Sequence, residues 1–164
     1  MLFRSGTPSQ ICISKKKAHV CVFCEKEQQK LQRHQRRKHN AEPEVAAALA
    51  LKEGSERQIL AFERLGLKGD YRHNCNVLKL GEGEIIVVRN PSVQQQDKKK
   101  SFLPWPHCLG FFKGNELRRH AKKCPHQSQD RSQKFSKVQQ DAKLLLPTLS
   151  LSTNDVDQAL YSAN

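Results

Sequence analysis

The stretch HVCVFCEKEQQKLQRHQRRKH, residues 19–39, determines how the chain is expected to fold. Cys21 and Cys24 are separated by two residues, and His34 and His39 by four. Zinc prefers four such ligands in a tetrahedron, with two cysteines from a tight turn and two histidines from one side of a following helix. Four ligands in this order seldom arise by chance. The stretch is therefore predicted to form a Cys2His2-like zinc finger, the alternative being a charged helix beside a chance Cys-x2-Cys pair.

The loop of this predicted finger is short. Nine residues separate Cys24 from His34, whereas a standard finger has about twelve. Leu31 lies three residues before His34, where the small core of a finger needs an apolar side chain. No aromatic residue lies between Cys24 and Leu31, so we expect Phe23 or Val20 to complete the core.

A second, incomplete ligand pattern occurs in LPWPHCLGFFKGNELRRHAKKC, residues 103–124. Eleven residues separate Cys108 from His120, and three separate His120 from Cys124. Trp105 stands three residues before Cys108, where a first cysteine is expected, and an indole nitrogen cannot coordinate zinc. We therefore expect a degenerate Cys2HisCys finger that binds metal weakly or not at all.

A water molecule at the missing position would give an open three-ligand site of the kind that catalytic zinc uses. His107 is adjacent to Cys108 and is expected to point elsewhere, whereas His126 can fold back past Pro125. No His-x-Glu or comparable base accompanies these ligands. No catalytic residue is predicted, and the chain is not expected to be an enzyme.

The run from Pro104 to Cys124 resembles a group of largely uncharacterised animal zinc-finger proteins. Their usual pattern is P-C-P-x-C-L-G-F-F followed by L-x-R-H-x3-C, from which this chain departs at Trp105. The resemblance extends to GDYRHN at 69–74, GEGE at 81–84 and LLLP at 144–147. It implies zinc binding and makes DNA binding an expectation. Some relatives carry a downstream tyrosine-recombinase-like core of mobile elements, for which the 17 residues after Pro147 leave no room.

The charge of the chain supports an anionic partner. Among 164 residues, 29 Lys and Arg stand against 16 Asp and Glu, a formal net charge of +13. Residues 1–40 hold ten basic and two acidic residues, and residues 101–126 hold five and one. Each basic block coincides with a ligand pattern, which favours nucleic acid over a merely solubilising surface. We expect DNA as the partner, with RNA as an alternative, and binding that weakens steeply with salt.

Finger-like docking would place particular basic side chains against nucleic acid. Arg33 and Arg119 are positioned to read guanine, and most of the others to meet phosphates. The predicted contacts are Lys30, Arg33, Arg36, Arg37, Lys38, Lys113, Arg118, Arg119, Lys122 and Lys123.

Local signals organise the rest of the chain. Pro43 suits the first position of a helix, and a capping box at 55–58 restarts one that Gly66 and Gly69 are expected to end. β-Branched runs on both sides of Gly81–Gly83 predict a hairpin over 76–89. The predicted fold class is a small metal-stabilised α+β protein with two separate finger-like units. Its expected parts are a flexible basic tail (1–18), the first finger (19–40), a helical spacer (41–70), a hairpin and linker (71–100), the degenerate finger (101–126) and a mostly disordered tail (127–164).

Other function classes are weighed against DNA binding. A hydrophobic content of 37% is low for a protein with a single large core. No signal peptide or membrane-spanning run is seen, so we expect zinc ligands rather than disulfides and a nuclear location. Cys12 and Cys75 are expected to be free thiols.

Two other functions are alternatives to DNA binding. The chain could be a protein-interaction module with an apolar docking face at 43–65, or a remnant of a longer mobile-element protein.

Overall fold

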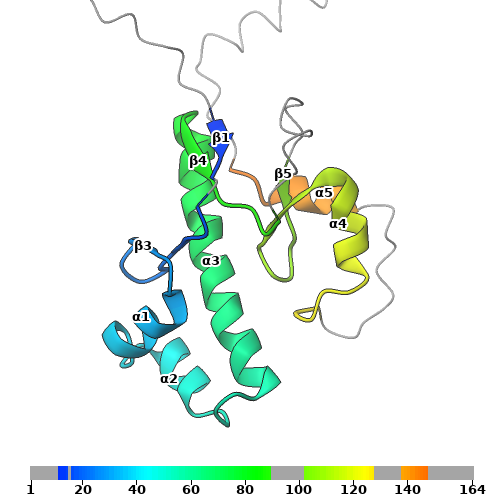
Figure 1. Cartoon of the computed structure of the whole chain (residues 1–164). Coiled ribbons are helices and arrows are strands. Elements are labelled where there is room, and N and C mark those ends of the chain that lie inside the picture. The colour runs from blue at the N-terminus through cyan, green and yellow to red at the C-terminus, as the bar shows by residue number, and fades with distance from the viewer. Residues whose placement is uncertain (1–10, 15, 90–101, 128–137, 148–164) are drawn as a thin grey trace, which may run out of the picture.

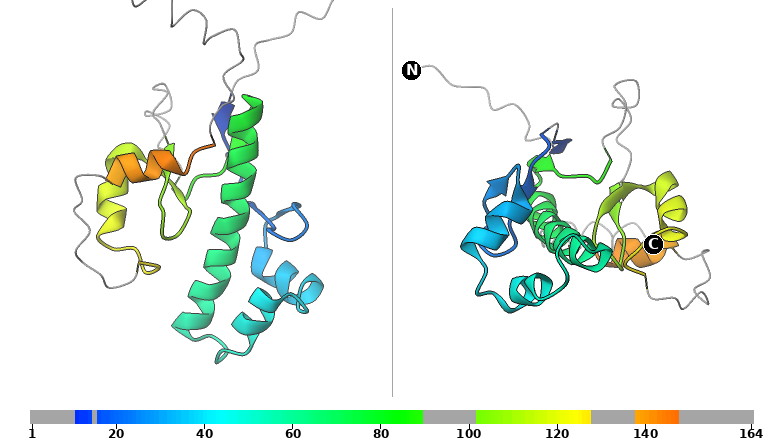
Figure 2. Two further views of the ribbon diagram at one scale, coloured as in Figure 1. Left: turned by 180° about the vertical axis from the view of Figure 1, so that it is seen from behind. Right: turned by 60° about the horizontal axis from the view of Figure 1, so that its bottom comes forward.

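A single long helix, α3 (Glu56–Leu80), forms the centre of the computed structural model (Figure 1). The structure describes residues 11–14, 16–89, 102–127 and 138–147. A small unit lies on each side of α3, and the views from behind and from below agree on this arrangement (Figure 2). The first unit comprises β2 (His19–Val20), β3 (Glu27–Gln28), α1 (Leu31–Lys38) and α2 (Pro43–Leu49). The second comprises β5 (Phe102–Pro104), β6 (Phe111–Lys113), α4 (Gly114–Ala121) and α5 (Val138–Leu144).

Both ends of α3 are capped. The Ser55 side chain accepts a hydrogen bond from the Gln58 backbone N–H at 3.3 Å, which confirms the predicted helix start. The predicted stop at Gly66 and Gly69 is wrong, because both glycines lie inside the helix and face the first unit. The helix instead ends at Gly81, whose φ of 75° is the left-handed conformation typical of a C-terminal glycine. None of the helices in the described ranges combines the length and apolarity needed to cross a bilayer.

The predicted hairpin is also wrong. Residues 76–80 continue α3, and β4 (Gly83–Ile85) pairs in parallel with β1 (Ile11–Ile13) rather than with a neighbouring strand. Val77 is buried and lies against Gly83, so its apolar side chain serves a helix face instead of a strand. Strand β1 gives residues 11–13 of the expected flexible tail a defined structure.

Two apolar clusters form the core. In the first, Val45 and Ala48 of α2 pack against Phe62 and Leu65 of α3, with Phe23 at the edge. This cluster occupies most of the apolar face at 43–65 that an interaction module would use for docking. The second apolar cluster gathers the apolar side chains of the second unit, with Leu67 of α3 packed against it. Its buried members are Leu103, Trp105, Cys108, Phe112, Leu117, Ala121, Cys124, Val138 and Ala142.

Helix α5 belongs to this second apolar cluster, although it lies in the region expected to be mostly disordered. Val138 and Ala142 are four residues apart, so they lie on one face of the helix. Both are buried against the second unit. For the described residues 138–147, the prediction of disorder is therefore corrected.

Candidate metal centres and their surroundings

The first ligand set converges as its spacing predicts. Cys21 and Cys24 lie in the turn that follows β2, His34 lies on α1, and His39 caps the end of that helix. One ligand atom from each of the four residues lies within 4.8 Å of the others. The His34 Nε2 atom is 3.2 Å from both Cys24 Sγ and His39 Nε2. These four residues, here called the first cluster, can hold a metal ion.

The charge state of the first cluster suits a metal. Burial lowers the pKa of His34, and electrostatic interactions with His39, Lys38 and Lys26 lower it further. His34 is thus neutral near pH 7, as a metal ligand must be. Burial also raises the pKa of Cys21, so this thiol keeps its proton until a cation displaces it.

The first unit is fastened to α3 by hydrogen bonds that the ligand pattern does not reveal. The Val20 backbone N–H donates to Asp70 Oδ1 at 2.8 Å, and His19 Nδ1 lies 2.6 Å from Asp70 Oδ2. Asp70 is buried, and its hydrogen bond raises the pKa of His19. Arg72 donates to the backbone carbonyl of Val22 at 3.3 Å. The turn that carries Cys21 therefore rests on a polar face of α3.

The stretch 69–74, here called the docking segment, reaches three parts of the chain. Tyr71 donates to the Leu145 carbonyl at 2.6 Å, just beyond α5. His73 Nε2 lies 2.9 Å from the Glu84 carbonyl. The buried Asn74 amide both donates to and accepts from the Ile86 backbone, at 2.7 Å each. In the sequence, the GDYRHN motif stands out only as part of an expected family resemblance, and it predicts none of these contacts.

The second cluster of ligands consists of Cys108, His120 and Cys124, whose ligand atoms lie within 4.8 Å of one another. Cys108 Sγ is 3.4 Å from His120 Nε2, and the Phe112 ring stacks on the His120 ring at 3.9 Å. The Cys108 thiol hydrogen-bonds the Cys124 sulfur, which lowers the pKa of Cys124 and raises that of Cys108. The two sulfur atoms and the His120 ring nitrogen therefore lie close enough together to bind one cation.

Trp105 occupies the backbone position that corresponds to the first ligand of the first cluster. In each turn, the residue at this position accepts a hydrogen bond from the N–H four residues later and donates to the carbonyl five residues later. The pairs are Cys21 with Glu25 and Lys26, and Trp105 with Leu109 and Gly110, at 2.7–3.0 Å. The residue after the second ligand position, which is Cys24 in one turn and Cys108 in the other, has a positive φ: 57° at Glu25 and 64° at Leu109. The second turn thus keeps the ligand-bearing backbone and presents an indole in place of a thiol.

Neither nearby histidine completes the second cluster. His126 Nε2 lies 3.7 Å from Glu63 Oε2, so this side chain turns towards α3. The His107 ring centroid lies 5.3 Å from that of Trp105, and His107 is not in the cluster. The Trp105 indole is 2% exposed, and its Nε1 has no hydrogen-bond partner. The second cluster therefore has three ligands and a buried indole in the described part of the chain.

The ten basic side chains predicted to contact nucleic acid fall into two groups. Eight are exposed: Lys30, Arg33, Arg37, Lys38, Arg118, Arg119, Lys122 and Lys123. Arg36 instead donates to Gln58 Oε1 at 3.0 Å, pairs with Glu53 at 3.3 Å and lies over the Phe62 ring at 5.1 Å. Lys113 is buried in β6, with 4% exposure. The side chain of Arg36 is therefore engaged by its neighbours and that of Lys113 is buried, and all ten contacts stay predictions.

Comparison with protein-family models, with curated proteins and with solved structures finds no match to this chain. The resemblance drawn from the sequence, including its link to mobile elements, therefore stays a prediction.

Proposed function

We propose that this chain is a zinc-stabilised nucleic-acid-binding protein without catalytic activity, and that DNA is its main partner. The first cluster supports the zinc part of the proposal, because two thiols and two imidazoles form a donor set of the kind found in structural zinc sites. Zinc there would join α1 to the turn before it, in a unit with little core of its own. A nuclear location accords with this proposal.

The observation that carries the nucleic-acid part is the distribution of exposed charge. No acidic residue occurs in 29–41 or in 117–127, and each stretch exposes four basic side chains. Surfaces of one sign attract a polyanion and gain affinity from the release of its counterions. Helices α1 and α4 lie on opposite sides of α3, so they form two separate contact regions rather than a tandem array (Figures 1 and 2). We therefore propose binding through phosphates more than through bases.

The test is the salt dependence of affinity for a random 20-base-pair duplex, measured by fluorescence anisotropy. The slope of log K against log[salt] has a magnitude of about 0.9 for each phosphate that the protein neutralises. Replacing Arg33, Arg37 and Lys38 by Gln is expected to reduce the slope by about 2 to 3. The matched control replaces three exposed basic residues elsewhere, Lys52, Arg57 and Arg64. Equal slopes in both triple variants, or a flat wild-type profile, would contradict the proposal. A single-stranded RNA of equal charge tests the alternative partner.

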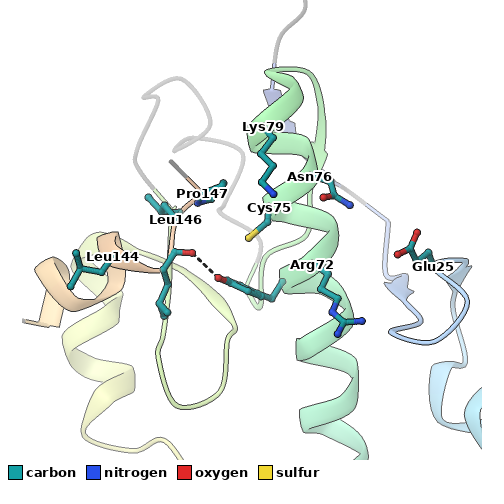
Figure 3. A pocket seen from close by; sticks show the side chains of 10 residues that line it. Glu25, Arg72, Cys75, Asn76, Lys79, Leu144, Leu146 and Pro147 are labelled. Carbon is teal, nitrogen blue, oxygen red and sulfur yellow. Dashed lines mark hydrogen bonds between the residues drawn. The ribbon is translucent and has the colours of Figure 1, made fainter. Parts of the chain in front are cut away.

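A groove in the structure favours protein binding as a second candidate function. Its volume is about 720 Å³, and it lies between α3 and the segment 144–147 (Figure 3). Arg72, Cys75 and Lys79 are on the helix side, while Leu144 is 83% exposed on the other. Burial, together with a hydrogen bond to Cys75, raises the pKa of Tyr71 to about 12, so Tyr71 stays neutral and bonded to Leu145 beside the groove. A zinc-loaded chain with no duplex affinity at low salt would favour this candidate.

A further inference from the structure

The second cluster presents a coordination problem that zinc does not solve well. Two sulfurs and one imidazole converge, and the residue at the fourth ligand position is Trp105. Structural zinc sites are almost always four-coordinate, and catalytic sites add water or substrate at the open position. Here that position belongs to a 2% exposed indole, and Cys108 is equally buried. A cation satisfied by two thiolates and one imidazole fits this cluster better than zinc.

Copper(I) is such a cation. Thiolate ligands select soft ions such as Cu(I), and imidazole is also a suitable copper ligand. Cu(I) and Zn²⁺ both have a closed d-shell, but the single charge of Cu(I) allows it to be stable with three ligands. The indole of Trp is the aromatic group that best accommodates a neighbouring cation, within about 6 Å of its ring. Trp105 also lies close to the ligand His120, with ring centroids 6.3 Å apart and planes at 87°.

We propose that the second cluster is a three-coordinate Cu(I) site, in which Cys108, His120 and Cys124 bind the ion and Trp105 closes the fourth direction. This goes beyond the proposed function, because zinc at the first cluster and nucleic-acid binding do not depend on it. Two thiolates and Cu(I) leave one negative charge.

The full chain offers a direct readout, because Trp105 is its only tryptophan. The chain is first loaded with zinc, and Cu(I) is then added without oxygen as its acetonitrile complex, buffered by a Cu(I) chelator. Tryptophan emission excited at the red edge reports the second cluster, and native mass spectrometry counts both metals. We expect one equivalent of Cu(I) to quench Trp105 while one zinc is retained. Replacing Cys12 and Cys75 by Ser removes the thiols outside the clusters and is expected to leave the titration unchanged.

Two variants test the site, one by removing a ligand and the other by adding one. Cys108→Ser is expected to abolish the quenching and to keep one zinc. Trp105→Cys restores the fourth ligand and is expected to bind a second zinc, which the wild type does not retain. Even if either variant fails to fold, the wild-type titration decides the question.

Three results would overturn the copper proposal: two tightly held zinc ions in the wild type, Cu(I) that displaces zinc from the first cluster before Trp105 responds, or no quenching at all. Failure of the proposed function is separately visible, as loss of the single wild-type zinc or of the salt-dependent duplex binding.

Discussion

The backbone carbonyl of Val20 lies so close to Gly69 that a side chain on this helical residue would overlap it. The contact brings the turn of the first cluster directly onto the backbone of α3. Asp70, the next residue, then reaches the N–H of Val20. Glycine at position 69 is thus required by the approach of two backbones and not by a turn.

Gly69→Ala is expected to destabilise the protein by roughly 1 to 3 kcal/mol or more, because the obstructing atoms are backbone and cannot move aside cheaply. Gly66→Ala is the matched control. Its Cβ would meet only the flexible Leu31 side chain at 3.2 Å. Both changes gain about 1 kcal/mol of helix propensity. In urea unfolding of the zinc-loaded chains, the free energy of unfolding should be clearly higher for Gly66→Ala than for Gly69→Ala. Equal values would refute the close approach of the Val20 carbonyl to Gly69.

Zinc removal should loosen the first unit and leave α3 largely helical. Chelation, or Cys24→Ser, is expected to expose the backbone N–H groups of α1 to hydrogen exchange, since α1 is an eight-residue helix with no side-chain cap at its start. Hydrogen exchange with mass spectrometry checks this region by region. Cys12→Ser should change neither the exchange nor the zinc content, because Cys12 lies on β1, outside the cluster.

The pair of His19 and Asp70 makes stability depend on pH. The pKa of His19 is raised in the folded state, above the ordinary value of 6.5. Its stabilisation is therefore complete below about pH 6.5 and is lost as the pH rises through the folded-state value. We expect the stability advantage of wild type over His19→Gln to shrink between pH 6 and 8.5. Taking the difference between the two zinc-loaded proteins cancels the pH dependence of metal binding.

Asp70→Asn provides the control for this pH dependence, because it removes the negative charge that raises the pKa of His19. In the Asp70→Asn protein, His19→Gln should change the free energy of unfolding by the same amount at every pH. A wild-type advantage that stays constant across the range would show that the pair does not titrate as described.

Arg36 and Arg37 are neighbours with opposite expected roles. Arg36→Gln should cost about 1 kcal/mol, because it removes the hydrogen bond to Gln58 and the packing on Phe62, while the salt slope of duplex binding stays unchanged. Arg37 is exposed, so Arg37→Gln should leave stability unchanged and reduce the slope by about 0.9. Unfolding and anisotropy measurements on the same preparations check both expectations. The reverse assignment would place Arg36 on the binding surface.

Both Cys/His clusters could be predicted from the sequence because their residues are close along the chain. A tight turn and one or two helical turns bring them together whatever surrounds them. The start of α3 was predictable for the same reason, since Ser55 and Gln58 form a local cap. The substitution at Trp105 was visible in the sequence, but its burial beside the second cluster was not.

The length of α3 was not predictable, because its buried face is not apolar. Besides Phe62, Leu65 and Val77, the helix buries polar groups and glycines. These are Gln58, Gly66, Gly69, Asp70 and Asn74. Their spacing is helical, but a search for apolar periodicity cannot detect it. Each of the polar three has a specific hydrogen-bond partner that only the folded chain supplies.

The position of the docking segment in the chain also sets an order of assembly. The first cluster has all its ligands once residue 39 has been synthesised, but Asp70 lies 50 residues beyond its partner Val20. Tyr71 in turn waits for Leu145, 74 residues further on. Contacts between such distant segments form late, because the intervening loop must first be closed. Metal capture should therefore precede docking during synthesis, so that the growing chain carries an ion before it has a completed fold.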